Sequence, residues 1–267
     1  MGLLVALIYG ALGVDYSDMN PLVVYVAQFI PPLVYVLYKA REVVNENGRL
    51  IEQGLFDRIQ QPVEINRFNT GKVKGGVAVL LTVVATLSLM VVLEPLNMLV
   101  PMPESVKDVY REILDNMFWT SLSVAVAAPL LEEFFLRGII LRGMLYHATP
   151  LKSVLWSAFF FALIHLNLYQ ALGAFMIGLF MGWIYYRTGS LCLTVLIHFV
   201  NNGSSVLFTL LFPEVDIEAT LMDVITEQWS IEAYVAVFAG AFLALGAIIW
   251  YFQKKLGYGE GKEIISA

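Results

Sequence analysis

Seven polar side chains lie within the most apolar part of the sequence, where their presence needs an explanation. They are Glu132, Glu133, Arg137, His165, His198, Asn201 and Asn202. An ionisable side chain inside a membrane costs roughly 3 kcal/mol or more, so such residues are retained when they pair, line water or react. Carboxylates, histidines and amides together could activate a water molecule and stabilise a negative charge, which is hydrolytic chemistry.

The distance of these residues from the turns predicts that their side chains lie close together in the membrane. If two helices turn near residues 149–150, Glu132 and His165 both lie roughly 23–25 Å along their helices from that turn. Adjacent antiparallel helices would then hold both side chains at similar depth. His198 and Asn202 are four residues apart, so they share one face of a helix. We expect three helices to contribute to one polar cluster.

The charged residues of this region divide into a pair and a single carboxylate. Glu133 and Arg137 are four residues apart with the glutamate first, which favours an ion pair within one helix. Glu132 points about 100° away from Glu133, so it can face a cavity while its neighbour is paired. Pro129 has no N–H and frees a backbone carbonyl near Ala125. A bend there would open the helix beside Glu132.

The composition indicates an integral membrane protein. Of the 267 residues, 59% are hydrophobic and only 14% are charged, with a mean hydropathy of +0.74, whereas soluble domains have roughly a quarter charged residues. We predict an all-α, polytopic membrane helix bundle that forms a single domain over residues 1–267. Apolar runs of about 20 residues are typical of transmembrane helices. The eight expected spans are 2–14, 22–38, 75–93, 118–146, 152–167, 171–186, 190–212 and 231–252.

The connections between these spans alternate in charge. Loop 39–74 carries seven lysines and arginines, whereas loop 213–230 carries five acidic residues and no basic one. Because basic loops stay in the cytoplasm, we expect a multi-pass protein of the cell membrane with both termini cytoplasmic. The amphipathic segment 106–117 is expected either to lie in the membrane interface or to form a lid or gate for a substrate. The sequence has no basic stripe, so no nucleic-acid partner is expected.

Several reactions fit a carboxylate, two histidines and an asparagine. A serine nucleophile is poorly supported because no serine near the cluster lies in a GxSxG context. A zinc site has the right ligand types, but the HExxH spacing is absent. No cofactor is therefore expected, and zinc stays an alternative. In metal-free hydrolysis, Glu132 would be the general base on a water that His165 also holds, and His198 and Asn202 would stabilise the oxyanion.

Three short motifs carry a resemblance to a known family. "EEFFLR" (132–137), "FALIH" (161–165) and "HFVNN" (198–202) follow the patterns EExxxR, FxxxH and HxxxN on successive hydrophobic segments. In this order they resemble the CAAX prenyl endopeptidases, part of a wider group of CAAX proteases and bacteriocin-processing enzymes called the Abi group. The short loops are similar to those of prokaryotic members.

The resemblance implies an intramembrane glutamate-type endopeptidase with its catalytic core at 118–212. By motif position, Glu132 and His165 would activate the water, and His198 and Asn202 would form the oxyanion hole. The pair of Glu133 and Arg137 would support the site. The partners implied are the lipid bilayer and a peptide or protein substrate, prenylated in the case of CAAX processing.

Two other classes of function stay open at this point. A non-catalytic membrane scaffold or immunity protein would keep the polar cluster as structure. A transporter could use buried carboxylates and histidines as a proton relay, although the sequence shows no paired halves. Outside the cluster, Gly178 and Gly182 have the spacing of close helix packing, and Asn201 is expected to make a helix contact.

Overall fold

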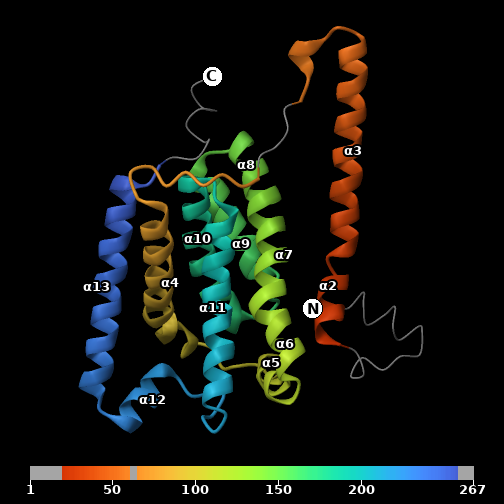
Figure 1. The fold of residues 1–267 in the computed structure, drawn as a ribbon. Helices are drawn as coiled ribbons and strands as arrows, with labels where there is room; N and C mark the ends of the chain where they lie inside the picture. The colour runs from red at the N-terminus through yellow and green to blue at the C-terminus, as the bar shows by residue number, and fades with distance from the viewer. Residues whose placement is uncertain (1–19, 61–64, 258–267) are drawn as a thin grey trace, which may run out of the picture. The chain divides into compact units, whose positions relative to one another are not determined.

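The structure is a computed structural model that describes residues 20–60 and 65–257. Every regular element in these two ranges is a helix, as the all-α prediction requires (Figure 1). Five segments within them are long and apolar enough to cross a membrane, so this is a multi-pass membrane protein. They are Pro21–Glu52, Gly75–Leu96, Leu168–Thr188, Leu191–Leu211 and Ile231–Lys255. The predicted number of eight spans is not confirmed, and the expected span 2–14 lies outside the described residues.

The chain divides into two compact units, one ending at Glu64 and the other beginning at Ile65. The first contains α2 (Pro21–Ala27), α3 (Ile30–Glu52) and the short η2 (Phe56–Arg58). In this unit the side chain of Asn47 accepts from the N–H of Gln60 at 2.9 Å and donates to its carbonyl at 2.8 Å. This pair ties the end of the unit back to α3. The single domain over 1–267 stays a prediction.

The second unit contains all the candidate site residues. Its elements are α4 (Gly75–Asn97), α5 (Glu104–Asp115), α6 (Met117–Leu122), η3 (Ser123–Ala127), α7 (Ala128–Glu133), η4 (Phe134–Leu141), α8 (Arg142–His147), α9 (Pro150–Leu163), α10 (Leu168–Thr188), α11 (Leu191–Leu211), α12 (Leu221–Gln228) and α13 (Ile231–Lys255). The main apolar core joins α4, α9, α10, α11 and α13. Met181, Ile184 and Ile197 are fully buried within it.

The expected span 118–146 is a continuous helical run from α6 to α8 that two π-helical segments interrupt. Its η3 and η4 segments are π-helical, with bonds between residues five apart. At the end of η3 the N–H of Ala128 donates to the carbonyl of Ser123. The next residue, Pro129, has no N–H and cannot continue this pattern. Pro129 therefore lies at a boundary between π and α geometry, and π segments are frequent at functional sites.

The helix in the expected span 152–167 ends earlier than predicted. Helix α9 ends at Leu163, and its 14 residues cover about 21 Å, less than the roughly 30 Å of bilayer hydrocarbon. The backbone leaves the helix at 164–167, where Leu166 has a φ of 55°. Asn167 then caps α10 by accepting from the N–H of Gln170 at 2.8 Å. His165 consequently lies on a connection and not within a helix.

Small residues bring α9 and α10 into close contact. A Cβ atom added at Gly178 would lie 3.1 Å from Cα of Ala158, and one added at Gly182 would lie 3.1 Å from a methyl carbon of Val154. Only a residue without a side chain lets the helix backbones approach this closely. The prediction that this glycine pair serves packing is confirmed.

The two ends of the second unit differ in charge. Helices α5 and α12 lie at one end (Figure 1), and the segments there are mostly acidic, with Lys107 held between Glu104 and Glu218 at 3.1 and 2.5 Å. The opposite end carries Lys152 and the basic end of α13. The acidic and basic ends agree with the alternation of acidic and basic loops along the sequence. The cytoplasmic placement of the basic end stays a prediction.

Candidate active site

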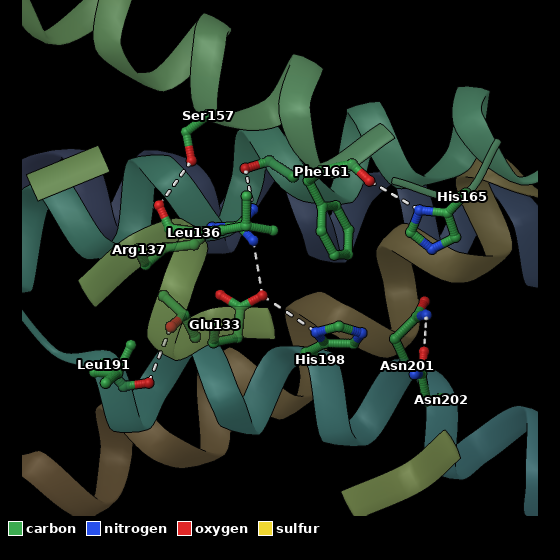
Figure 2. Close-up of polar contacts among 12 residues, drawn as sticks. Glu133, Leu136, Arg137, Ser157, Phe161, His165, Leu191, His198, Asn201 and Asn202 are labelled. Carbon is green, nitrogen blue, oxygen red and sulfur yellow. Dashed lines mark hydrogen bonds and ion pairs between the residues drawn. The ribbon is translucent and has the colours of Figure 1, made fainter. Parts of the chain in front are cut away.

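The charged centre of the site joins α7, η4 and α11. Arg137 donates from Nη1 to Oε1 of Glu133 at 2.7 Å, and both side chains are completely buried. Nδ1 of His198 lies 3.2 Å from the same carboxylate oxygen (Figure 2). The predicted pair of Glu133 and Arg137 is therefore confirmed. The contact with His198 adds a second helix to it.

Arg137 is held on two further sides by groups from the α9–α10 pair. Its Nη2 donates to the carbonyl of Gly178 at 3.1 Å. Its guanidinium carbon lies 4.7 Å from the centre of the Phe161 ring, within the range of a cation–π contact. A buried guanidinium needs several partners to offset its lost hydration. The carboxylate of Glu133, the carbonyl of Gly178 and the ring of Phe161 supply them.

Phe161 connects the two histidines. Its ring makes edge-to-face contacts with both His165 and His198, with ring centres 5.2 Å apart in each case. Its carbonyl lies 2.8 Å from Nδ1 of His165. Figure 2 shows the Phe161 ring between Arg137 and the His165 ring. Phe161 is buried whereas His165 is half-buried, so this histidine lies closer to the surface of the site.

The partners of the two histidines fix where their protons lie. A carbonyl oxygen only accepts, so Nδ1 of His165 carries the hydrogen that Phe161 O receives, and in the neutral ring Nε2 keeps a lone pair. His198 faces a carboxylate instead, so its Nδ1 also donates. Nε2 of His198 is the ring atom on the side away from Glu133. The two rings are therefore suited to different roles.

Asn202 bridges α11 and η3. Its Nδ2 donates to the carbonyl of Val124 at 2.9 Å, and its Oδ1 accepts from Nδ2 of Asn201 at 3.0 Å (Figure 2). Both asparagines are half-buried. The bond from Asn201 lies within α11, and its expected contact with another helix stays a prediction.

Glu132 is the second buried carboxylate of α7, with 5% of its surface exposed. It interacts electrostatically with His165 and with Arg137. Contacts through Phe161 and Glu133 therefore connect Arg137, His165 and His198, and the meeting of Glu132 with His165 at one catalytic centre stays a prediction. Among the residues that the structure describes, no group of three His, Cys, Asp or Glu side chains is arranged to hold a metal ion.

Three parts of the site were missed by the reasoning from sequence. They are the backbone carbonyls of Val124, Phe161 and Gly178. Carbonyl acceptors leave no trace in residue type, so their roles depend on the fold. Phe161 did carry a signal, because it precedes His165 by four residues in "FALIH" and so lies one helical turn away.

Comparison with known protein families gives a match to the region that holds the site. Residues 114–204 match the family model of the Rce1-like type II CAAX prenyl endopeptidases. The matched segment begins near the end of α5 and ends within α11, so it contains all six predicted site residues. No curated protein and no solved structure gave a significant match to the chain.

Proposed function

We propose that this membrane protein is an endopeptidase in which Glu132 activates the attacking water, because residues 114–204 match the Rce1-like type II CAAX prenyl endopeptidase family. The observation that carries the proposal is the joining of His198 to the buried pair of Glu133 and Arg137. A single sequence motif could not produce this contact. The contact brings together residues of two motifs that are 65 positions apart in the chain.

The reaction begins with a water molecule held between Glu132 and His165. Glu132 accepts a proton from this water as the oxygen attacks the carbonyl carbon of the peptide bond. Nε2 of His165 accepts the second hydrogen bond of the water, because its Nδ1–H is committed to Phe161 O. When the C–N bond breaks, the proton on Glu132 passes to the leaving nitrogen. The products are a carboxylate and an amine.

The oxyanion of the tetrahedral intermediate is stabilised from α11. Nε2 of His198 donates in the imidazolium form, and the carboxylate of Glu133 compensates its charge. Asn202 donates through the second N–H of its amide group, since the first is bound to Val124 O. Donors that are already oriented before charge develops contribute strongly to such a step. Arg137 in turn holds Glu133 in place.

The substrate is a peptide or protein segment that reaches a site within the membrane. Prenylated CAAX tails are one class of such substrates, because a prenyl group anchors the peptide at the bilayer. Positively charged connections face the cytoplasm, so we place the basic end of the second unit, and both termini, on that side of the cell membrane. No cofactor takes part in this scheme, and the experiment below also tests the zinc alternative.

Cleavage of peptides by purified protein in detergent tests the proposal. Wild type, Glu132→Gln and Glu94→Gln would be incubated with prenylated and unprenylated peptide libraries, with and without chelator, and the products read by mass spectrometry. Glu94 is a matched control because it is also a buried glutamate, bonded to the hydroxyl of Tyr234 at 2.8 Å in a contact that glutamine can keep.

The expected result is chelator-resistant cleavage by wild type and Glu94→Gln that Glu132→Gln lacks. The ratio of prenylated to unprenylated products would define the substrate class. Cleavage that stops with chelator and returns with zinc would replace the proposed chemistry by a metal mechanism. Equal cleavage by Glu132→Gln and wild type would refute the role of Glu132. No cleavage by folded wild type would favour a scaffold.

A further inference from the structure

We propose that Pro129 positions the oxyanion residue Asn202, acting through the backbone carbonyl of Val124. The inference rests on the proposed function, because it concerns the orientation of a group assigned to the oxyanion hole. Pro129 is buried and makes no contact with the reacting atoms in this account. Pro129 acts as a positioning residue because it has no N–H to donate to the carbonyl of Val124.

The hydrogen bonds at the end of η3 leave one carbonyl for a partner outside its own helix. In α geometry the carbonyl of Val124 would accept from the N–H of Ala128, but that N–H donates to Ser123 O. In π geometry the donor would be residue 129, which is proline and has no N–H. A buried carbonyl that lacks a partner is costly. The amide of Asn202 supplies the partner at 2.9 Å.

This contact sets the orientation of the Asn202 amide. Because Val124 O can only accept, the atom facing it must be the nitrogen Nδ2 and not the oxygen Oδ1. The oxygen is then directed toward Asn201, whose Nδ2 donates to it at 3.0 Å. Both ends of the amide are therefore defined before a substrate binds. The second N–H of Nδ2 has a fixed direction, which is what an oxyanion donor requires.

An alanine at position 129 would restore the missing donor. Its N–H would compete with Asn202 for Val124 O, or close the π turn into an α turn and rotate the carbonyl away. Asn202 would then lose the contact that fixes its amide. Removal of a complete oxyanion donor lowers kcat by roughly 100- to 1,000-fold. A donor that is present but misdirected should lose less, so we expect kcat to fall about 10-fold with KM nearly unchanged.

Pro129→Ala and Pro95→Ala form a matched pair for the test. Pro95 also lies inside an apolar helix, α4, but outside the site. Each substitution would be made in wild type and in Asn202→Ala, and kcat and KM measured on the best peptide of the library. Folding would be checked by thermal unfolding in detergent. We expect Pro129→Ala to lower kcat about 10-fold in wild type and less than about 2-fold in the Asn202→Ala protein.

The same loss in both backgrounds, or no loss, would overturn the inference, because a purely structural effect does not depend on Asn202. A readout without catalysis is the side-chain ¹⁵N–¹H resonance of Asn202, assigned by its absence in Asn202→Ala. It should shift in Pro129→Ala and stay in place in Pro95→Ala. If Pro129→Ala does not fold, Pro129→Gly supplies the same N–H without a side chain and should shift the same resonance.

If the resonance moves but wild type cleaves no peptide, the proposed function fails while the positioning contact stands. If wild type cleaves and the resonance stays in place when residue 129 carries an N–H, the inference fails while the proposed function stands. The two results are therefore separable.

Discussion

Replacing Glu133 by glutamine should strongly destabilise the protein, because it leaves a buried charge without its counterion. The side chains of Glu133 and Arg137 are both 0% exposed and their nearest N and O atoms are 2.7 Å apart. Removing one member of such a pair costs about 3–5 kcal/mol. For a chain of this size, 1 kcal/mol shifts the unfolding temperature by about 2–4 °C. We therefore expect a fall of at least about 6 °C for Glu133→Gln.

An exposed ion pair with the same geometry provides the control. Asp108 and Arg111 are also 2.7 Å apart, but their side chains are 68% and 52% exposed. Water already solvates both charges, so Asp108→Asn should leave the unfolding temperature within error. The assay is thermal unfolding of each purified variant in the same detergent. Equal unfolding temperatures for Glu133→Gln, Asp108→Asn and wild type would refute the reasoning about the buried pair.

A double substitution separates stability from activity in this region. Replacing Glu133 and Arg137 together by leucine leaves no uncompensated charge, and such apolar replacements are often close to neutral in stability. His198 would nevertheless lose the carboxylate that accepts from its Nδ1. We expect the double variant to unfold at a higher temperature than Glu133→Gln while its peptide cleavage stays low.

Two further predictions concern packing and pH. Gly178→Ala should lower stability by about 1–3 kcal/mol, because its Cβ would lie 3.1 Å from Cα of Ala158; Gly173→Ala in the same helix meets nothing within 4 Å and should unfold no earlier than wild type. At the start of α12, hydrogen bonds from the hydroxyl and the N–H of Thr220 lower the pKa of Asp223. Because the folded-state pKa is lowered, this stabilisation is present above the ordinary carboxyl range and is lost as pH falls through the lowered pKa. The protection of α12 amides, after correction for the intrinsic exchange rate at each pH, should therefore fall below about pH 4, and Thr220→Ala should weaken that dependence; corrected protection that does not change with pH would contradict it.

Side-chain periodicity predicted much of the site, and backbone geometry accounts for the parts that it missed. The spacing of Glu133 and Arg137 predicted their ion pair, and the apolar runs predicted the helices α4, α10, α11 and α13. The end of α9 at Leu163 was not predictable in this way, because Ile164 and Leu166 continue the apolar run of the helix. Asn167, as the cap of α10, is the local signal for that break.

The π segments around Pro129 illustrate the same limit. The proline predicted a freed carbonyl near Ala125, and the structure shows that the neighbouring carbonyl of Val124 receives the amide of Asn202. The missing N–H of a proline can be recognised in a sequence. The donor that takes its place, Asn202, lies on a helix that is remote in the chain. Tertiary contacts of this kind connect the three motifs, and each motif alone is unspecific.

The most direct test of the central claim is the effect of Glu132→Gln on kcat. The kcat of wild type, Glu132→Gln and Glu94→Gln would be measured on the best peptide from the library with chelator present. The comparison requires that all three proteins unfold at similar temperatures. A general base contributes roughly 100- to 10,000-fold to the rate. The account therefore predicts a loss of at least about 100-fold in kcat for Glu132→Gln and an unchanged kcat for Glu94→Gln. A Glu132→Gln protein that cleaves the peptide at the wild-type rate would contradict it.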